Sequence, residues 1–267
     1  MKVITFLNEK GGVGKTTLAT NLAVGLMLRG YRVLLIDSDA QGNATNVLQI
    51  PKSGGFYRLM VDDAPWADVL QVVPADCTGP VPQGAGLFCV PSNFETASVA
   101  AFIGEKISVL HLRRRLMELA DLFDFIIFDT QPNPTRVHEA IIFASDNLIL
   151  PTDCGSFSSW EGLPDTVAHT ERIRRDASSV NVSVGEIIGI LPNMYRTKTS
   201  LAQHMVQSLK ETYGDLVWDA IPLRQAIQDA QVLREFLFTT TQVPETTKVL
   251  WAFVDKVLEK VAVKHED

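Results

Sequence analysis

The chain has 267 residues, of which 46% are hydrophobic and 21% are charged, and it carries a formal net charge of −7 at neutral pH. This length and apolar content suffice for one substantial core, so we expect a single domain over residues 1–267, and the net acidity argues against a strong intrinsic nucleic-acid footprint. The three cysteines (Cys77, Cys89 and Cys154) are widely spaced and form no CxxC pair, which indicates neither a zinc site nor a disulfide framework and fits a reducing cytosol.

A phosphate-binding loop is predicted at residues 9–17, which read EKGGVGKTT. The apolar run at 3–7 reads as a buried strand, and residues 16–29 carry apolar side chains at helical spacing. Strand, loop and helix therefore come in the order that such a loop requires. The ordinary motif has a glycine five positions before its last glycine, whereas Glu9 stands there in this chain, followed by Lys10. The loop is thus a deviant form with two lysines.

The residue types in the loop favour binding of a nucleotide triphosphate. Gly11, Gly12 and Gly14 permit backbone conformations that a Cβ forbids, so main-chain N–H groups can face an anion at the positive end of the helix. Lys15 then supplies charge to the β and γ phosphates, and the Thr16 hydroxyl is placed to ligate Mg²⁺. A glycine-rich turn with a stray lysine is the alternative, and the flanking strand and helix disfavour it.

Two further apolar strands end in carboxylates. Residues 32–39 end with Asp37 and Asp39, and residues 125–129 end with Asp129. Open α/β sheets bind ligands at the carboxyl ends of their strands, where a carboxylate can hold Mg²⁺ or orient the attacking water. Each carboxylate alone could equally cap the following helix. Together with the phosphate loop, they favour nucleotide hydrolysis.

The rest of the chain alternates strand and helix patterns, as an α/β fold with a doubly wound, mostly parallel sheet requires. Residues 51–86 are rich in proline and glycine, and we expect an irregular connection with short helical pieces there. Further strands are expected at residues 87–91, 147–151, 186–191 and 216–221, and helices at 105–120, 136–145, 159–175 and 199–212.

The C-terminal residues 245–263 place apolar side chains on one side of a helix. Helices that lie on membranes are typically basic on their polar face, whereas this one mixes lysines with acidic residues, which favours packing against the domain. The apolar start is interrupted too soon for a signal peptide, and no run approaches transmembrane length. We therefore expect a cytoplasmic protein without a membrane partner.

These motifs resemble those of the ParA/MinD family of deviant Walker A ATPases, and its ParA-type (Soj-like) partition branch in particular. KGGVGKTT at 10–17 fits the signature loop, DSDAQGNAT at 37–45 is similar to DxDPQGNAT, and DTQP at 129–132 stands where the family has DxPP. ILPNMYRTKT at 190–199 and GDLVWDAIPLR at 214–224 resemble its later strands and loops. The resemblance implies a P-loop ATPase that uses ATP and Mg²⁺.

For the loop, the resemblance implies a role for each matched residue. Lys15 would bind the β and γ phosphates, Thr16 would ligate Mg²⁺, and Thr17 would contact the α-phosphate. Lys10 is similar to the signature lysine, which reaches across a nucleotide-sandwich homodimer to the partner's ATP. The nucleotide-binding residues are then Lys10, Gly11, Gly12, Val13, Gly14, Lys15, Thr16 and Thr17.

Outside the loop, the resemblance assigns Asp39 to hydrolysis, beside Lys10 and Lys15 as catalytic residues. Asp37 and Asp129 match the carboxylates near the metal, and Asn193 and Pro222 lie where the family forms its adenine pocket.

Two positions depart from the family pattern. Ala40 and Gln131 stand where relatives carry prolines. Because proline fixes φ and removes a backbone donor, both loops are expected to be looser or hydrogen-bonded differently. We expect this to affect the hydrolysis rate and the coupling to nucleotide, and to leave ATP binding intact.

The resemblance further implies that the ATP dimer binds nonspecific DNA on the nucleoid and positions a plasmid, chromosome or other cargo, with a ParB-like or other cargo-adaptor protein stimulating hydrolysis. Phosphate contacts require clustered Lys or Arg, and each cluster in this chain could equally be a solvated surface. The candidate patches are Arg113–Arg115, Arg172 with Arg174 and Arg175, and Arg196 with Lys198.

Two alternatives remain open. The first is a MinD-like, membrane-associated spatial regulator, in which ATP-dependent dimerisation drives the terminal helix onto lipid; the acidic residues of that helix weigh against it. The second is a reductase like the nitrogenase iron protein, whose cluster needs cysteine ligands from each subunit. Because the cysteines of this chain are isolated from one another, we rank the reductase below the other two functions.

Overall fold

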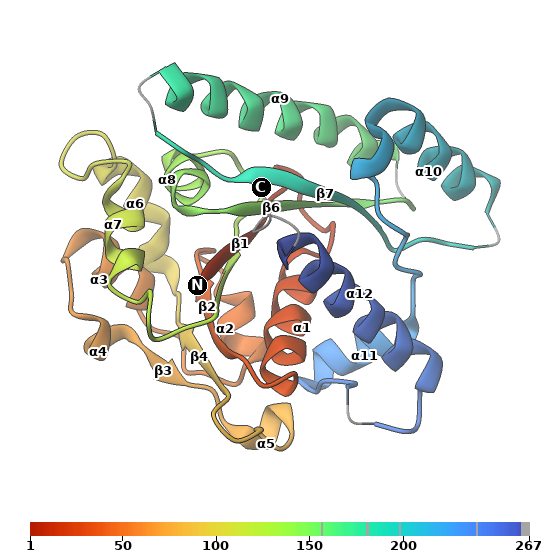
Figure 1. The fold of residues 1–267 in the computed structure, drawn as a ribbon, viewed down its shortest axis with the longest axis horizontal. Coiled ribbons are helices and arrows are strands. Elements are labelled where there is room, and N and C mark those ends of the chain that lie inside the picture. The colour runs from red at the N-terminus through yellow and green to blue at the C-terminus, as the bar shows by residue number, and fades with distance from the viewer. Residues whose placement is uncertain (156, 180–181, 198, 239, 263–267) are drawn as a thin grey trace.

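The computed structural model describes residues 1–155, 157–179, 182–197, 199–238 and 240–262 (Figure 1). Its sheet has seven strands in the order β3-β4-β2-β5-β1-β6-β7, and all neighbouring pairs are parallel except β3 and β4. The predicted α/β fold with a doubly wound, mostly parallel sheet is confirmed. The strands are β1 (Lys2–Phe6), β2 (Arg32–Asp37), β3 (Gln71–Val72), β4 (Gly86–Val90), β5 (Phe125–Asp129), β6 (Asn147–Asp153) and β7 (Glu186–Asn193).

Helices cover both faces of the sheet. Those described are α1 (Lys15–Leu28), α2 (Asn43–Val47), α3 (Gly55–Val61), α4 (Trp66–Val69), α5 (Ala75–Thr78), α6 (Val99–Phe102), α7 (His111–Met117), α8 (Arg136–Ala144), α9 (Phe157–Ser179), α10 (Ser200–Tyr213), α11 (Gln225–Leu233) and α12 (Pro244–Ala262). α1 and α12 pack together on one face, α7 and α8 lie on the other, and α9 flanks β6 and β7 (Figure 1).

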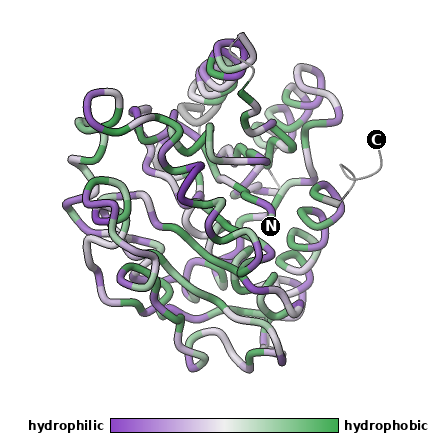
Figure 2. Tube along the Cα trace, turned by 60° about the vertical axis from the view of Figure 1, so that its left-hand side comes forward, coloured by the Kyte–Doolittle hydropathy of each residue, from purple (hydrophilic) through white to green (hydrophobic). Residues whose placement is uncertain are grey.

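Strand residues alternate between the two faces because successive side chains of a strand point to opposite sides. On β1, Ile4 and Phe6 belong to the core beneath α1 and α12, whereas Val3 belongs to the core beneath α7 and α8. Figure 2 shows the strands as a largely hydrophobic interior with hydrophilic segments around it. Burial on both faces explains why these strands are near-continuous apolar runs in the sequence.

The strand predicted at 216–221 is wrong. Residues Gly214–Leu216 form a 3-10 turn, and Val217 makes only an isolated bridge to Ile190. The indole of Trp218 lies across β7, where a Cβ added to Gly189 would be 2.2 Å from the ring, and its Nε1 donates to the Ile188 carbonyl. The segment therefore lies along the sheet edge without forming a regular strand. It is held by the Trp218 side chain and by backbone hydrogen bonds from Trp218 to the Ile190 carbonyl at 2.9 Å and from Ile221 to the Pro192 carbonyl at 2.8 Å.

Some predicted helices and connections differ in extent. The helix expected at 105–120 is ordered as α7 over His111–Met117, after a turn in which Gly104 donates to the Ile107 carbonyl. Residues 51–86 contain α3, α4 and α5, and also β3, which adds an antiparallel edge strand. The pattern missed α11 because a single residue of that helix, Ala230, is buried.

The apolar face of α12 is buried in the core that this helix shares with α1. Phe253 is 4% exposed and its ring lies 6.2 Å from that of Phe6. A Cβ added to Gly25 of α1 would lie 2.5 Å from Val254, so the glycine permits this close approach. None of the described helices is long and apolar enough to cross a bilayer. The apolar face of α12 therefore packs against the rest of the domain.

We expect Phe253→Ala to lower the free energy of unfolding by about 3–5 kcal/mol, because the substitution leaves a cavity between α12 and the sheet. Urea denaturation followed by circular dichroism measures this loss. Asp255→Ala is the matched control on the exposed side of α12; it removes an exposed ion pair with Arg29 and should cost less than about 1 kcal/mol. Equal stability of the wild type and Phe253→Ala would contradict the packing of α12.

Candidate functional site

The loop between β1 and α1 has the backbone that an anion site needs. Gly12 and Gly14 have φ angles of 78° and 92°, a region that residues with a Cβ rarely adopt. A Cβ added to Gly14 would also lie 2.3 Å from the Asn193 amide nitrogen, so space as well as conformation requires glycine. Gly14 directly precedes α1, and the positive end of that helix therefore faces the loop. The loop lines an open cavity of about 580 Å³.

The side chain of Lys15 is folded back into this loop. Its Nζ donates hydrogen bonds to the carbonyl oxygens of Asn8, at 2.8 Å, and Lys10, at 2.9 Å. Burial lowers the pKa of Lys15 to about 8, with nearby Asp129 and Asp39 acting in the opposite direction. The ammonium group therefore remains charged at neutral pH, at the wall of the cavity.

Two buried carboxylates lie side by side at the same edge of the sheet, because the register of β2 and β5 pairs Asp37 with Asp129. Thr16 Oγ1 donates to Asp129 Oδ2 at 2.7 Å, and Asp37 Oδ2 accepts from the backbone and hydroxyl of Thr45 at 2.8 and 2.7 Å. Burial raises the pKa of Asp37 to about 6. Burial and the charge of Asp37 raise the pKa of Asp129 well above its usual value.

This arrangement fits a magnesium ion. Asp129 Oδ1 is buried and has no hydrogen-bond partner in the described parts of the chain, and a cation would compensate both carboxylates. Thr16, Asp37 and Asp129 are the residues that would hold it. The described residues contain no group of three or more His, Cys, Asp and Glu able to bind a metal. Mg²⁺ keeps several waters and takes further ligands from substrate phosphates, so two carboxylates and a hydroxyl suffice for it.

Asp39 follows β2 and lines the same cavity as the phosphate loop. Its Oδ1 accepts a hydrogen bond from the backbone of Gln41 at 2.9 Å, and its carbonyl accepts one from Ser92 Oγ at 2.7 Å. Ala40 lies beside it on the cavity wall. Sequence reasoning missed Ser92, which follows β4 at the same sheet edge; only its position after a buried strand could have indicated it.

The loop after β5 is held by hydrogen bonds. Gln131 Nε2 donates a hydrogen bond to Thr135 Oγ1 at 3.0 Å, and the main-chain carbonyl oxygen of Gln131 accepts one from His138 Nε2 at 2.9 Å. His138 Nδ1 accepts in turn from the Thr135 backbone at 3.2 Å, which makes a capping box at the start of α8. Burial lowers the pKa of His138 to about 4, so the ring is neutral. Gln131 thus adds a side-chain tether at the position where the DxPP pattern has its first proline.

Lys10 is half-exposed and lies against α9, and it is not among the residues that line the cavity. Gly162 of α9 permits this contact, because a Cβ added there would lie 3.3 Å from the Cβ of Lys10. Glu9 Oε1 is paired with His169 Nδ1 at 2.6 Å, and the Glu9 backbone donates to Thr166 Oγ1 at 3.2 Å. One face of α9 therefore fixes the backbone that carries Lys10.

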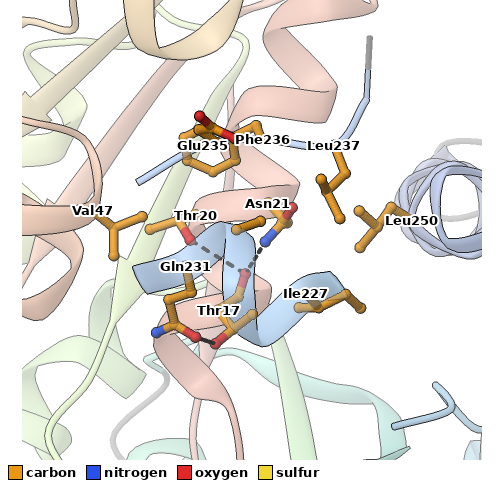
Figure 3. Close-up of a pocket in the computed structure, with 11 residues that line it drawn as sticks. Thr17, Thr20, Asn21, Val47, Ile227, Gln231, Glu235, Phe236, Leu237 and Leu250 are labelled. Atoms are coloured by element: carbon orange, nitrogen blue, oxygen red, sulfur yellow. Dashed lines mark hydrogen bonds between the residues drawn. The ribbon is translucent and has the colours of Figure 1, made fainter. Parts of the chain in front are cut away.

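A second cavity, of about 120 Å³, adjoins the first and is lined by Asn193 and Pro222, the two residues predicted for an adenine pocket. Asn193 Nδ2 also donates to the Val13 carbonyl at 2.9 Å, so it ties β7 to the phosphate loop. Thr17 and Gln231 border both cavities, and Thr17 Oγ1 donates to Gln231 Oε1 at 2.7 Å (Figure 3). Gln231 lies on α11, which the sequence did not predict.

The basic patch predicted at Arg113–Arg115 is not supported, because two of its side chains hold the fold together. Arg115 is buried and donates to Asp63 at 2.6 Å and to the Ala64 carbonyl at 2.9 Å. Arg113 donates to the carbonyl of Phe143 at 3.2 Å. Nothing in the sequence of the three consecutive arginines indicates that two of them make these structural contacts.

The other predicted patches remain at the surface. Arg172 and Arg175 are exposed on α9. Arg196 is exposed as well, and together with Arg224, which sequence reasoning missed, it lines an open hollow of about 250 Å³. Lys198 lies outside the described residues. The hollow shares Pro222, Leu223 and Arg224 with the second cavity, so Arg224 also lines the candidate base pocket and Arg196 lies beside it.

Comparison with known proteins agrees with this geometry. Residues 1–184 match the protein-family model described as an AAA domain. The chromosome-partitioning ATPase Soj of Treponema pallidum is 31% identical over 221 residues, which cover 82% of each chain. Among solved structures, apo McdA from Cyanothece has a TM-score of 0.80 at 22% identity and covers 97% of this chain and 99% of its own. The septum site-determining protein MinD of Pyrococcus horikoshii, complexed with Mg-ADP, has a TM-score of 0.71 at 18% identity, with 100% and 99% covered.

We expect the neutral His138 ring to make the stability of the loop after β5 depend on pH. The folded-state pKa, about 4, lies below the ordinary 6.5, so the stabilising contribution is complete above pH 6.5 and is lost as the pH falls through 4. The stability difference between the wild type and His138→Gln should therefore be larger at pH 7 than at pH 5, by roughly 2 kcal/mol. Urea denaturation at both pH values measures it, and equal differences would show that His138 titrates normally.

Proposed function

Since this chain belongs to the ParA/Soj family of partition ATPases and is itself an ATPase, we propose that ATP joins two copies of it and that the closed dimer binds DNA without sequence preference. One observation carries the proposal. The loop has two lysines with different positions: Lys15 at the wall of the cavity, and Lys10 outside it, on the surface against α9. If a second copy faced this edge, the Lys10 ammonium group of the first copy would contact the nucleotide bound to the second copy.

We assign the cavity to the phosphates of ATP. Lys15 would exchange its hydrogen bonds to the Asn8 and Lys10 carbonyls for bonds to the β and γ phosphate oxygens, which are stronger because both partners are charged. Thr17 would bind the α-phosphate, and the cavity lined by Asn193 and Pro222 would receive the adenine.

Hydrolysis then depends on the acidic edge of the sheet. Mg²⁺, held by Thr16, Asp37 and Asp129, supplies charge neutralisation for the phosphates when bound. Asp39 lines the cavity from the next loop and would orient the attacking water. Its hydrogen bonds to Gln41 and Ser92 hold it in place. The whole chain of 267 residues would act as a single ATPase domain.

For DNA, the favoured contact is the exposed pair Arg196 and Arg224. Both line one hollow, and two arginines on one surface can bind adjacent phosphates despite a net charge of −7. A ParB-like or other cargo-adaptor protein would stimulate hydrolysis and release the dimer from the nucleoid in the cytoplasm, which positions a plasmid, chromosome or other cargo. A MinD-like membrane role has less support, because the apolar face of α12 is buried.

We expect Lys10→Ala to lower ATP turnover at least about tenfold, because the variant loses the charge that one copy lends to the other. The affinity of the single subunit for a fluorescent ADP analogue should change less than about threefold, since Lys10 lies outside its own cavity. Wild-type turnover per molecule should rise with protein concentration. Lys106→Ala, an exposed lysine far from the loop, is the control. Wild-type turnover in Lys10→Ala would refute the role in trans.

Because Arg224 also lines the candidate base pocket, DNA binding is compared at saturating ATP. Under that condition we expect the double substitution Arg196→Ala, Arg224→Ala to weaken binding to duplex DNA of any sequence. The slope of log affinity against log salt concentration should become shallower by about 0.9 for each phosphate contact removed. Fluorescence anisotropy at several salt concentrations measures both effects. Arg175→Ala on α9 is the comparison, and if it reduces the slope while the double variant does not, α9 is the DNA-binding surface instead.

A further inference from the structure

Three cavities of the structure meet at one hydrogen bond. Thr17 and Gln231 are common to the linings of the cavity assigned to the phosphates, the candidate base pocket and a small pocket of about 10 Å³ between α1 and α11. Figure 3 shows their side chains pointing toward each other, from α1 and α11, with the bond between them. The two residues are 214 positions apart in the chain, so the bond links the phosphate loop to a distant helix.

The Thr17 hydroxyl cannot serve two acceptors at once. A hydroxyl has a single proton to donate, and Thr17 donates it to Gln231 Oε1 at 2.7 Å. Thr17 also lines the cavity that we assign to the phosphates, in the first turn of α1. A phosphate oxygen in that cavity is a charged acceptor, which forms a stronger hydrogen bond than a neutral amide oxygen does. Nucleotide and Gln231 therefore compete for the same proton.

The helix that carries Gln231 is lightly held. Ala230 is the buried residue of α11, whereas Val232 and Leu233 are 82% and 64% exposed. Beyond the helix, Gln49 Nε2 donates to the Arg234 carbonyl at 3.1 Å. Elements with few buried apolar contacts open and shift at low free-energy cost. Ile227 of α11 packs against the main core from a partly buried position, and the hydrogen bond to Thr17 adds to that contact, so its loss weakens the hold on α11.

The opposite end of α11 reaches the basic hollow. Arg224 is the residue that precedes the first turn of α11, and it lines the hollow with Arg196. Gln231 lies seven positions after Arg224, which along an α-helix is a span of about 10 Å. A helix moves as a rigid body over that length, so a displacement at Gln231 is transmitted to Arg224.

We propose that Gln231 is a positioning residue that responds to nucleotide. Without nucleotide, Gln231 accepts the hydrogen bond from the Thr17 hydroxyl. When a nucleotide phosphate accepts that hydrogen bond instead, α11 is released and the Arg196–Arg224 pair is rearranged. The inference rests on the nucleotide and DNA sites proposed above. It adds the physical link between them, and it assigns the coupling to one amide side chain.

Hydrogen exchange of the peptide that spans residues 224–234 tests the release directly, without nucleotide and with Mg²⁺ and a nonhydrolysable ATP analogue. In the wild type, the analogue should raise exchange of this peptide several-fold. In Gln231→Ala, exchange without nucleotide should already be raised, by about three- to tenfold, the factor that a typical neutral hydrogen bond contributes. Val232→Ala, the exposed neighbour on the same helix, should behave as the wild type does.

DNA binding tests the transmission. The ratio of DNA affinities with and without the analogue should fall about three- to tenfold in Gln231→Ala, and the affinity of the single subunit for nucleotide should rise by a similar factor, because Gln231 no longer competes for the Thr17 hydroxyl. The inference is overturned if the analogue binds and leaves the wild-type exchange unchanged, or if Gln231→Ala matches the wild type in both assays. If the wild type binds no DNA with ATP, the proposed DNA function fails, while the exchange experiment still decides whether Gln231 holds α11.

Discussion

The site depends on the burial of Asp37 and Asp129 side by side, which the parallel register of β2 and β5 imposes. Two carboxylates without a cation are costly in such a position, and both have raised pKa values for that reason. Hydrogen bonds from Thr45 and Thr16 offset part of the cost. A cation beside the phosphate loop would offset the desolvation cost that remains, and the positive end of α1 favours an anion at the same place. A magnesium nucleotide supplies both charges.

The sheet explains how distant residues meet at this edge. β1, β2, β5 and β7 run parallel, so the loops that follow them emerge on the same side. They bring together the phosphate loop, Asp39, the loop with Gln131, and Asn193. α9 and α11 then contact this group from its two sides, through the pair of Glu9 with His169 and the pair of Thr17 with Gln231. α9 is therefore connected to the residue that precedes Lys10, and α11 is connected to the hydroxyl of Thr17.

The sequence predicted those parts of the molecule that follow from local patterns. Buried parallel strands are continuous apolar runs, so their positions, and with them Asp37 and Asp129 at one edge of the sheet, could be predicted, although among these strands only β5 ends at the predicted residue. The strand at 216–221 was wrong because the packing of Trp218 over Gly189 decides that segment, and no periodicity shows it. Arg115 looked like a surface residue, although it is buried against Asp63. Gln231 could not be found from the sequence because its partner lies 214 residues away.

The proposed function requires that two copies of this chain hold a magnesium nucleotide between them. Sedimentation velocity of the wild type, with Mg²⁺ and a nonhydrolysable ATP analogue, tests this dimer most directly. We expect a species of about 59 kDa, twice the 29.4 kDa of the chain, which returns to the single chain when the analogue is replaced by ADP. A 29.4 kDa species at saturating analogue and high protein concentration would contradict it.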